Sequence, residues 1–214
     1  MSNSVLPKFS LDQIKMSDNV VMVGGPASDK TALGIQLLTK KMKYGVKEGW
    51  VAAGSKNQVT QYKNALSKVN SDHQVVVGSR IHRETLLKFI NEAVEKKGNC
   101  PKRFVLIDSL VLKETNLPLL EQIIDKGLNI LLVFLANSTY DVPALFRHKF
   151  NYVLVDKYPV GRAPHLADLL KNSAAHKLKM TELVKNYQNH GILVLDNHEK
   201  VKDLEKENKV MLKC

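Results

Sequence analysis

The chain has 214 residues, 44% of them hydrophobic, and a formal net charge of +11 at pH 7. These values predict one α/β domain with a sizeable core, and they exclude a repetitive or low-complexity chain. The excess of Lys over acidic residues suits a polyanionic partner such as DNA, and a solvated Lys-rich surface is the alternative interpretation.

Two features of the sequence indicate a compartment. Cys100 and Cys214 lack a metal-ligand spacing and are typical of free thiols in a reducing environment. The N-terminus has no apolar signal region, and the longest apolar run, 128–136, is too short to span a bilayer. We therefore expect an intracellular protein with no membrane partner.

Short apolar runs alternate with helical patterns along the chain. Strands are predicted at 20–23, 50–53, 74–77, 104–107, 128–135, 152–155 and 192–195, and helices at 31–43, 58–68, 84–97, 117–126 and 177–188. This alternation favours a parallel sheet, in which ligands bind at the carboxyl ends of the strands. A loop entering a helix is expected at 157–171, and alternating Lys and Glu predict a solvated helix at 200–213.

A turn with the sequence GGPASDKT follows the first predicted strand. Its spacing is that of a phosphate-binding loop, G-x-x-x-x-G-K-[ST], which places an anion at a helix N-terminus. Lys30 would reach the β- and γ-phosphates, and the Thr31 hydroxyl would ligate Mg²⁺. A Gly-Pro turn before a Lys-rich helix is the alternative. The predicted nucleotide-binding residues are Gly24, Gly25, Pro26, Ala27, Ser28, Asp29, Lys30 and Thr31.

Asp29 stands where this motif has its second glycine. Glycine there permits a positive φ, which Asp tolerates better than most residues do. The carboxylate, however, would lie near phosphate oxygens, and like charges in contact cost about 1–4 kcal/mol.

Polar residues also follow two later strands. Asp108 ends the run FVLID, a Walker B pattern in which the acid binds Mg²⁺ beside Thr31. The next residue is Ser109, where many P-loop ATPases carry a second acid that polarises water. Asn137 follows the strand 128–135 as a candidate sensor of the γ-phosphate, with an Asn-Ser turn as the alternative.

Together these residues resemble the FtsK–HerA branch of P-loop ATPases, and within it the poxvirus-type genome-packaging ATPases of large DNA viruses. The resemblance rests on GGPASDKT at 24–31, FVLIDSL at 104–110 and FLANSTYDVPALFRHKFNYVLV at 134–155, followed by the helix and strand at 180–196. It covers about 18–198, which leaves an N-terminal extension at 1–17 and a charged tail at 199–214. Asp141, Pro143 and Arg147 match the family's segment after the sensor strand.

The resemblance implies a RecA/ASCE-like P-loop NTPase, whose mostly parallel sheet is sandwiched by helices, with ATP and Mg²⁺ as cofactors. Carried over to this chain, the catalytic residues are Lys30, Asp108, Asn137 and Arg147, and the metal ligands are Thr31 and Asp108. Family members form homo-oligomeric rings in which an arginine reaches the neighbouring subunit's nucleotide. The candidates for that arginine are Arg147, Arg162, Arg80 and Arg83.

The leading hypothesis is an ATP-driven translocase that packages viral double-stranded DNA into a capsid, gripping DNA without reading its sequence. Capsid or portal proteins would then be partners, in the host cytoplasm or nucleus at sites of virion assembly, or in the virion. Because Asp29 and Ser109 both depart from the pattern, a degenerate nucleotide- or DNA-binding subunit stays open. A nucleoside kinase is a third hypothesis, although we find no Arg-rich lid.

Overall fold

The computed structural model describes residues 8–69, 73–80, 82–96, 101–171, 176–187, 191–198 and 208–211. Cys100 and Cys214 lie outside these ranges. The chain divides into two compact units: the first comprises 1–13, 20–30 and 136–214, and the second comprises 14–19 and 31–135. The boundary falls between Lys30 and Thr31, the first two residues of one helix.

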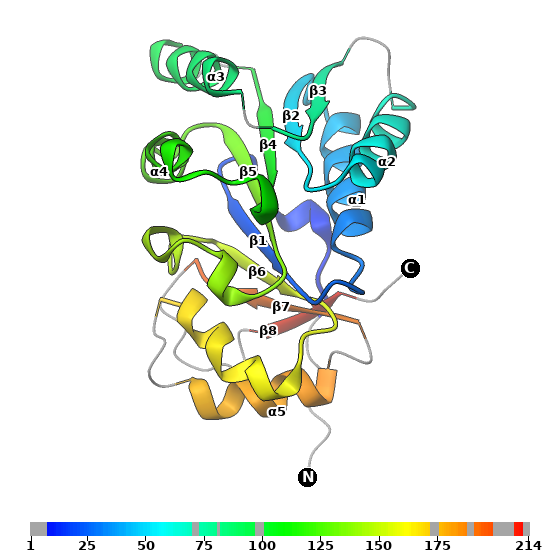
Figure 1. Ribbon diagram of the computed structural model, residues 1–214, viewed down its shortest axis with the longest axis vertical. Helices are drawn as coiled ribbons and strands as arrows, with labels where there is room; N and C mark the ends of the chain where they lie inside the picture. The colour runs from blue at the N-terminus through cyan, green and yellow to red at the C-terminus, as the bar shows by residue number, and fades with distance from the viewer. Residues whose placement is uncertain are drawn as a thin grey trace. The chain divides into compact units, whose positions relative to one another are not determined.

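The second unit contains a parallel sheet with helices on both faces. Its strands pair in the order β3-β2-β4-β5, and every pair is parallel. In Figure 1, α1 and α2 lie on one side of these strands, and α3 and α4 lie on the other. The strands are β2 (Glu48–Ala52), β3 (Gln74–Gly78), β4 (Arg103–Asp108) and β5 (Ile130–Ala136), and the helices are α1 (Lys30–Lys43), α2 (Lys56–Leu66), α3 (Arg83–Glu95) and α4 (Leu117–Asp125).

The first unit combines parallel and antiparallel strands. β1 (Asn19–Val23) runs parallel to β6 (Tyr152–Val155), whereas β7 (Ile192–Asp196) is antiparallel both to β6 and to β8 (Asn208–Met211). Within this unit the hydrogen-bonded order of the strands is β1-β6-β7-β8. The remaining elements of this unit are α5 (Lys177–Tyr187) and the 3-10 helices η1 (Leu11–Gln13), η4 (Thr139–Asp141), η5 (Ala144–Phe146) and η6 (Val160–Leu169).

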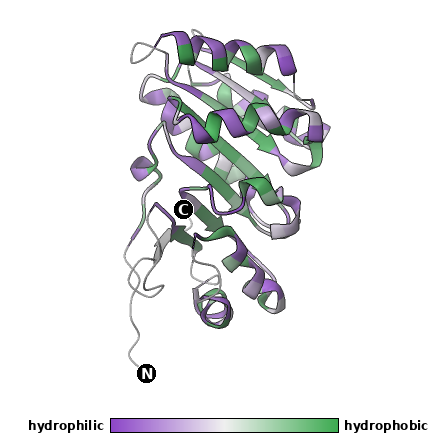
Figure 2. Cartoon of the chain, turned by 90° about the vertical axis from the view of Figure 1, so that its left-hand side faces the viewer, coloured by the Kyte–Doolittle hydropathy of each residue, from purple (hydrophilic) through white to green (hydrophobic). Residues whose placement is uncertain are grey.

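The strands that precede the predicted site residues are apolar and fully buried. Every residue of β1, β4 and β5 is buried, including Val21, Met22 and Leu131, which have no exposed surface. Figure 2 shows these strands as hydrophobic bands between helices of mixed character. A strand buried on both faces accepts few polar side chains, so the polar chemistry is confined to the strand ends.

Arg103, at the amino end of β4, is a buried cation with a structural role. Its guanidinium lies over the Phe89 ring at 4.7 Å, donates to Glu48 at 2.6 Å, and also bonds Glu92. Burial alone would lower the pKa of Arg103, but the hydrogen bonds that it donates to the two carboxylates outweigh that effect and raise the pKa, so the cation persists. This network lies at the amino end of β4, whereas Asp108 lies at its carboxyl end.

The fold confirms the predicted alternation of strands and helices, and the mostly parallel sheet. The helix expected over 200–213 is wrong for the part that is described, because 208–211 form β8 and pair with β7. The alternating charges of this segment do not indicate whether it can pair with the edge of a sheet. Pairing with the edge strand β7 determines its conformation here. The segment expected as a loop entering a helix forms the 3-10 helix η6, with Pro164 inside it.

Candidate functional site

The loop of residues 24–30 follows β1 in the first unit. Its first amide, Gly24 N, donates to the carbonyl of Ala136 at 3.1 Å, so the loop begins beside the end of β5. A Cβ on Gly24 would overlap the carbonyl oxygen of Asp156 and lie 2.7 Å from Ser28 Oγ. Gly24 is therefore required by the close approach of backbone, as expected for the first glycine of a phosphate-binding loop.

Lys30 folds back into its own loop. Its Nζ donates to Gly24 O at 2.6 Å, Gly25 O at 2.9 Å and Ser28 Oγ at 2.7 Å, and only 9% of the residue is exposed. These are three hydrogen bonds, and an ammonium group has three protons to donate. For Lys30 to bind a phosphate, at least one of these loop oxygens must be exchanged for a phosphate oxygen.

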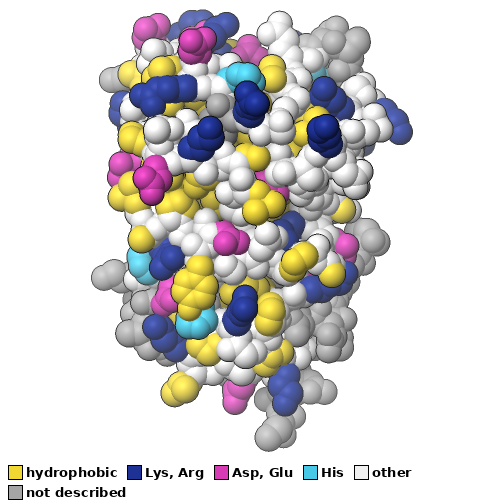
Figure 3. Space-filling view, in the orientation of Figure 1, with side chains coloured by type: hydrophobic (Ala, Val, Ile, Leu, Met, Phe, Trp, Pro, Cys, Tyr) yellow, Lys and Arg dark blue, Asp and Glu magenta, His cyan; other side chains and the backbone are white. Residues whose placement is uncertain are grey.

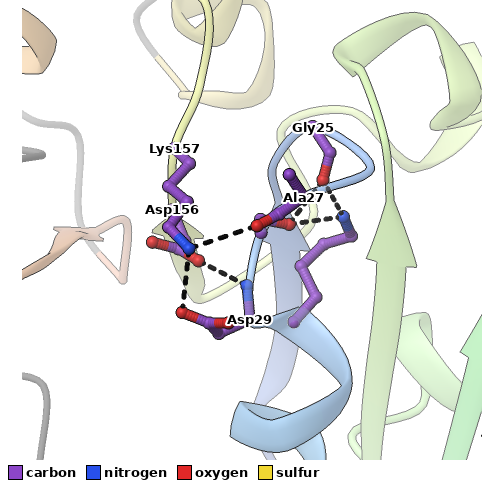
Figure 4. A network of polar contacts seen from close by, with 7 residues as sticks. Gly25, Ala27, Asp29, Asp156 and Lys157 are labelled. Carbon is purple, nitrogen blue, oxygen red and sulfur yellow. Dashed lines mark hydrogen bonds and ion pairs between the residues drawn. The ribbon is translucent and has the colours of Figure 1, made fainter.

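Asp29 is anchored to the segment that follows β6. Its backbone N–H donates to Asp156 Oδ2 at 2.6 Å, and its carboxylate pairs with Lys157 Nζ at 3.3 Å. Lys157 Nζ also donates to Ala27 O at 3.2 Å, and Figure 4 shows these groups together on one side of the loop. The side chains of Asp29 and Lys157 are 55% and 49% exposed, so their ion pair is worth about 0–1 kcal/mol.

The sequence raised two concerns about Asp29, its backbone conformation and its negative charge near phosphate, and this geometry answers both. Among the described residues other than glycine, only His148 and Lys157 have a positive φ, so the backbone of Asp29 does not need a glycine. Its carboxylate is directed to a cation at the surface, and the carboxylate of Asp156 instead accepts the N–H at the start of α1. That position favours an anion, because the helix dipole is positive there.

A second cluster of polar side chains lies in the second unit. Gln58 Nε2 donates to Thr31 Oγ1 and to Asp108 Oδ2, at 3.2 Å in each case. Thr31 comes from the first turn of α1, and Asp108 from the end of β4. The side-chain amide of Gln58 therefore links Thr31 and Asp108, the two predicted metal ligands.

The sequence analysis missed Gln58, although a local signal marks its position. Ser55 is the N-cap of α2, and its Oγ accepts from Gln58 N at 3.3 Å and donates to Gln58 Oε1 at 3.1 Å. The S-x-x-Q spacing is that of a capping box, which predicts a helix start. Because Ser55 holds the amide oxygen, the Nε2 of Gln58 faces Thr31 and Asp108.

Asp108 itself is nearly enclosed. It is 6% exposed, and its Oδ1 accepts from Leu110 N at 3.0 Å. A Cβ on Gly54 would lie 3.0 Å from its carboxyl carbon, so the segment that follows β2 approaches Asp108 closely. Burial raises the pKa of Tyr62, and the charge of Asp108 adds to this effect. The Tyr62 hydroxyl therefore remains protonated next to this carboxylate.

The donor set fits Mg²⁺. A hydroxyl and a carboxylate are hard oxygen ligands, and Mg²⁺ in phosphate-transfer sites takes only one or two carboxylates, completing its shell with water and substrate phosphate. Within the described ranges, no group of three or more His, Cys, Asp or Glu side chains could hold a metal by itself. Thr31 and Asp108 would thus hold Mg²⁺ only together with a nucleotide.

Asn137 follows β5 directly and lies in the first unit with the phosphate loop. The backbone amides of Asn137 and Ser138 both donate to Asp141 Oδ2 at 2.9 Å, so Asp141 closes the turn that carries Asn137. Since Gly24 bonds the carbonyl of Ala136, the turn begins next to the loop. Asp141 thus has a structural role in this turn.

The predicted arginines do not join either cluster. Arg147 is half-buried, and its Nε donates to Val142 O at 3.1 Å, within its own loop. Arg83 donates to Thr115 O at 2.8 Å, and both Arg80 and Arg162 are exposed.

Replacing Gln58 tests the second cluster without nucleotide. Gln58→Glu puts a second carboxylate against Asp108, so we expect the melting temperature to fall by about 2–10 °C without divalent ions. Mg²⁺ should recover most of that loss, because two adjacent carboxylates bind it. The control Gln61→Glu makes the same charge change on an exposed position of α2. An equal response of both variants to Mg²⁺ in thermal unfolding would contradict the cluster.

Comparison with known proteins finds relatives in structure alone. No family model and no curated protein matches the sequence. The structure is similar to the genome packaging NTPase B204 of Sulfolobus turreted icosahedral virus 2 in complex with AMP, at a TM-score of 0.65 and 16% identity, covering 94% of this chain and 100% of that chain. For B204 of Sulfolobus turreted icosahedral virus, a DNA-packaging ATPase, the values are 0.64 and 16%, over 87% and 96% of the two chains.

A third similar structure is the pCW3 conjugation coupling protein TcpA with ATPγS, at a TM-score of 0.53 and 11% identity, over 98% of this chain and 71% of that chain.

The described part of the chain has no helix long and apolar enough to cross a membrane. The predicted resemblance is confirmed at the level of the fold: the chain has the P-loop NTPase fold that the viral packaging NTPases also have.

Proposed function

We propose that this protein is an ATP-driven translocase that packages viral double-stranded DNA, with its ATPase domain over 18–198. The observation that carries the proposal is the Gln58 side chain, which hydrogen-bonds both Thr31 and Asp108. These are the two residues that we propose hold Mg²⁺, and Thr31 directly follows Lys30 in the chain. The similar viral proteins described as packaging NTPases support the same reading.

Nucleotide binding would begin at the phosphate loop. Lys30 would exchange its loop oxygens for phosphate oxygens, and the phosphate would take the place that the Asp156 carboxylate holds at the N-terminus of α1. Thr31 and Asp108 would hold Mg²⁺, which neutralises the charge on the phosphates when bound. Asn137 would contact the γ-phosphate or the attacking water from the end of β5.

Hydrolysis would proceed mainly by positioning, because no second acid follows Asp108. Ser109 Oγ is buried and has no hydrogen-bond partner among the described residues, and a hydroxyl is a poor base. Gln58 can orient a water molecule but cannot accept its proton. We therefore expect slow basal turnover that increases when a neighbouring subunit of a homo-oligomeric ring supplies an arginine, with Arg147 as the first candidate.

A catalytically degenerate subunit that binds nucleotide or DNA is the second candidate function. It is favoured by the internal bonding of the loop, in which Lys30 contacts loop oxygens and Asp156 holds the Asp29 amide. Such a protein would bind ATP without turning it over. Capsid or portal proteins are proposed partners in either case, at sites of virion assembly in the infected cell.

ATP turnover with and without double-stranded DNA tests the proposal. We expect DNA-stimulated hydrolysis in the wild type that falls to background in Lys30→Ala, which loses the phosphate-binding cation. Gln36→Ala, an exposed position on the same helix, should behave as the wild type does. If the wild type binds ATP but no condition gives turnover that exceeds Lys30→Ala, the degenerate subunit replaces the translocase.

The ion pair between Asp29 and Lys157 leads to a separate prediction about ATP affinity. Asp29→Asn alone should change ATP affinity by less than about twofold, because the carboxylate is already paired. Lys157→Ala should weaken ATP binding by about two- to fivefold, since it leaves the carboxylate unbalanced, and adding Asp29→Asn should restore the affinity. A titration with a fluorescent ATP analogue measures all four proteins. Additive effects of the two substitutions would show that the pair does not act as a unit.

A further inference from the structure

The positive charge of the second unit is distributed unevenly along the chain. Between 31 and 69 the sequence has a single acid, Glu48, whose carboxylate is bonded to Arg103. Among the lysines of this segment, Lys41 is buried and donates to Ile14 O. The exposed lysines are Lys43, Lys47, Lys56, Lys63 and Lys68.

Along α2 the exposed residues form one stripe. The spacing of Lys56, Thr60, Lys63 and Ser67 is i, i+4, i+7 and i+11, which keeps these side chains on one face of the helix, and all four are exposed. Tyr62 and Leu66 face the core instead. The stripe therefore offers ammonium and hydroxyl groups, and it contains no acid.

A hollow lies next to this stripe, between α1 and α2. Its volume is about 420 Å³, and amide and ammonium groups border it on the α2 side. The residues that line it are Ala32, Ile35, Gln61, Asn64, Ala65 and Lys68. The hollow is open and mostly apolar, and its hydrogen-bond donors lie on α2, next to the stripe.

The helices on the opposite face of the same sheet have a different charge pattern. α3 and α4 carry Glu84, Glu92, Glu95, Glu121 and Asp125. Lys88 there pairs with Glu92 at 3.9 Å, whereas Lys56, Lys63 and Lys68 form no ion pair with any described residue. In Figure 3, the edge where Figure 1 places α2 shows Lys and Arg side chains with no acidic ones beside them.

We propose that the exposed face of α2, with the hollow beside α1, is the surface that contacts the phosphate backbone of double-stranded DNA. We call it the α2 face, and it comprises Lys56, Thr60, Lys63, Asn64, Ser67 and Lys68. This inference rests on the proposed function for its choice of DNA as the polyanion, but its own basis is the charge difference between the two faces of one sheet.

The spacing of the lysines suits a phosphate backbone. Lys56 and Lys63 are about 10 Å apart along the helix axis, which equals the rise of about three phosphates of one strand measured along the DNA axis. Lysines bind phosphates as point charges, and the neutral donors between them add hydrogen bonds without reading bases. Binding at this face is therefore independent of sequence and sensitive to salt, as a translocating motor requires.

The test compares two triple variants with the same change of charge. Lys56→Ala/Lys63→Ala/Lys68→Ala removes the ammonium groups of the α2 face, and Lys88→Ala/Lys96→Ala/Lys126→Ala removes three exposed ones from the opposite face. Fluorescence anisotropy measures their binding to two labelled 30-base-pair duplexes of unrelated sequence, between 50 and 200 mM NaCl. Thermal unfolding and ATP binding check that both variants are folded.

We expect the α2-face variant to bind both duplexes at least about tenfold more weakly, and its salt slope to fall by about 2–3, since each lost phosphate contact contributes about 0.9. The opposite-face variant should retain wild-type binding. Equal losses in the two variants, or no loss in the α2-face variant, would overturn the inference and leave the proposed function standing. If the wild type binds neither duplex, the DNA-handling part of the proposed function fails as well.

Discussion

The constraint that governs this protein is the complete burial of its central strands. The middle residues of β1, β4 and β5 are apolar on both faces, so a polar side chain there could not reach a ligand without a large desolvation cost. Polar side chains come at the strand ends, as Asp108 closing β4 and Asn137 after β5, and the loop that begins at Gly24 follows β1. Polar side chains are thereby confined to the ends of these strands.

Two departures from the usual motif are accompanied by contacts from elsewhere in the chain. Asp29 would place a negative charge near phosphate, but Lys157 pairs with its carboxylate and Asp156 holds its amide. Ser109 stands where a second acid would directly follow Asp108, and Gln58 supplies a neutral donor to the Asp108 carboxylate. The residues that offset each change lie far from it in sequence.

Local patterns predicted most of the fold, because strands buried on both faces and amphipathic helices are specified by short stretches of sequence. The loop at 24–31 and the acid at Asp108 were predictable for the same reason. Gln58 was not, because its partner Asp108 is 50 residues away, and neither was the bond between Asp29 and Asp156, which are 127 residues apart. β8 was mistaken for a helix, since only the open edge of β7 determines its conformation.

Hydrogen exchange at the backbone amides, measured with and without ATP and Mg²⁺, tests the location of the site most directly. The account predicts slower exchange in peptides that cover 24–34, where the loop amides and the start of α1 would bind phosphate. It also predicts slower exchange at 55–59, because Gln58 would contact the bound metal site. ATP-dependent protection confined to other segments, with these peptides unchanged at saturating ATP, would contradict the assignment of the nucleotide to this loop.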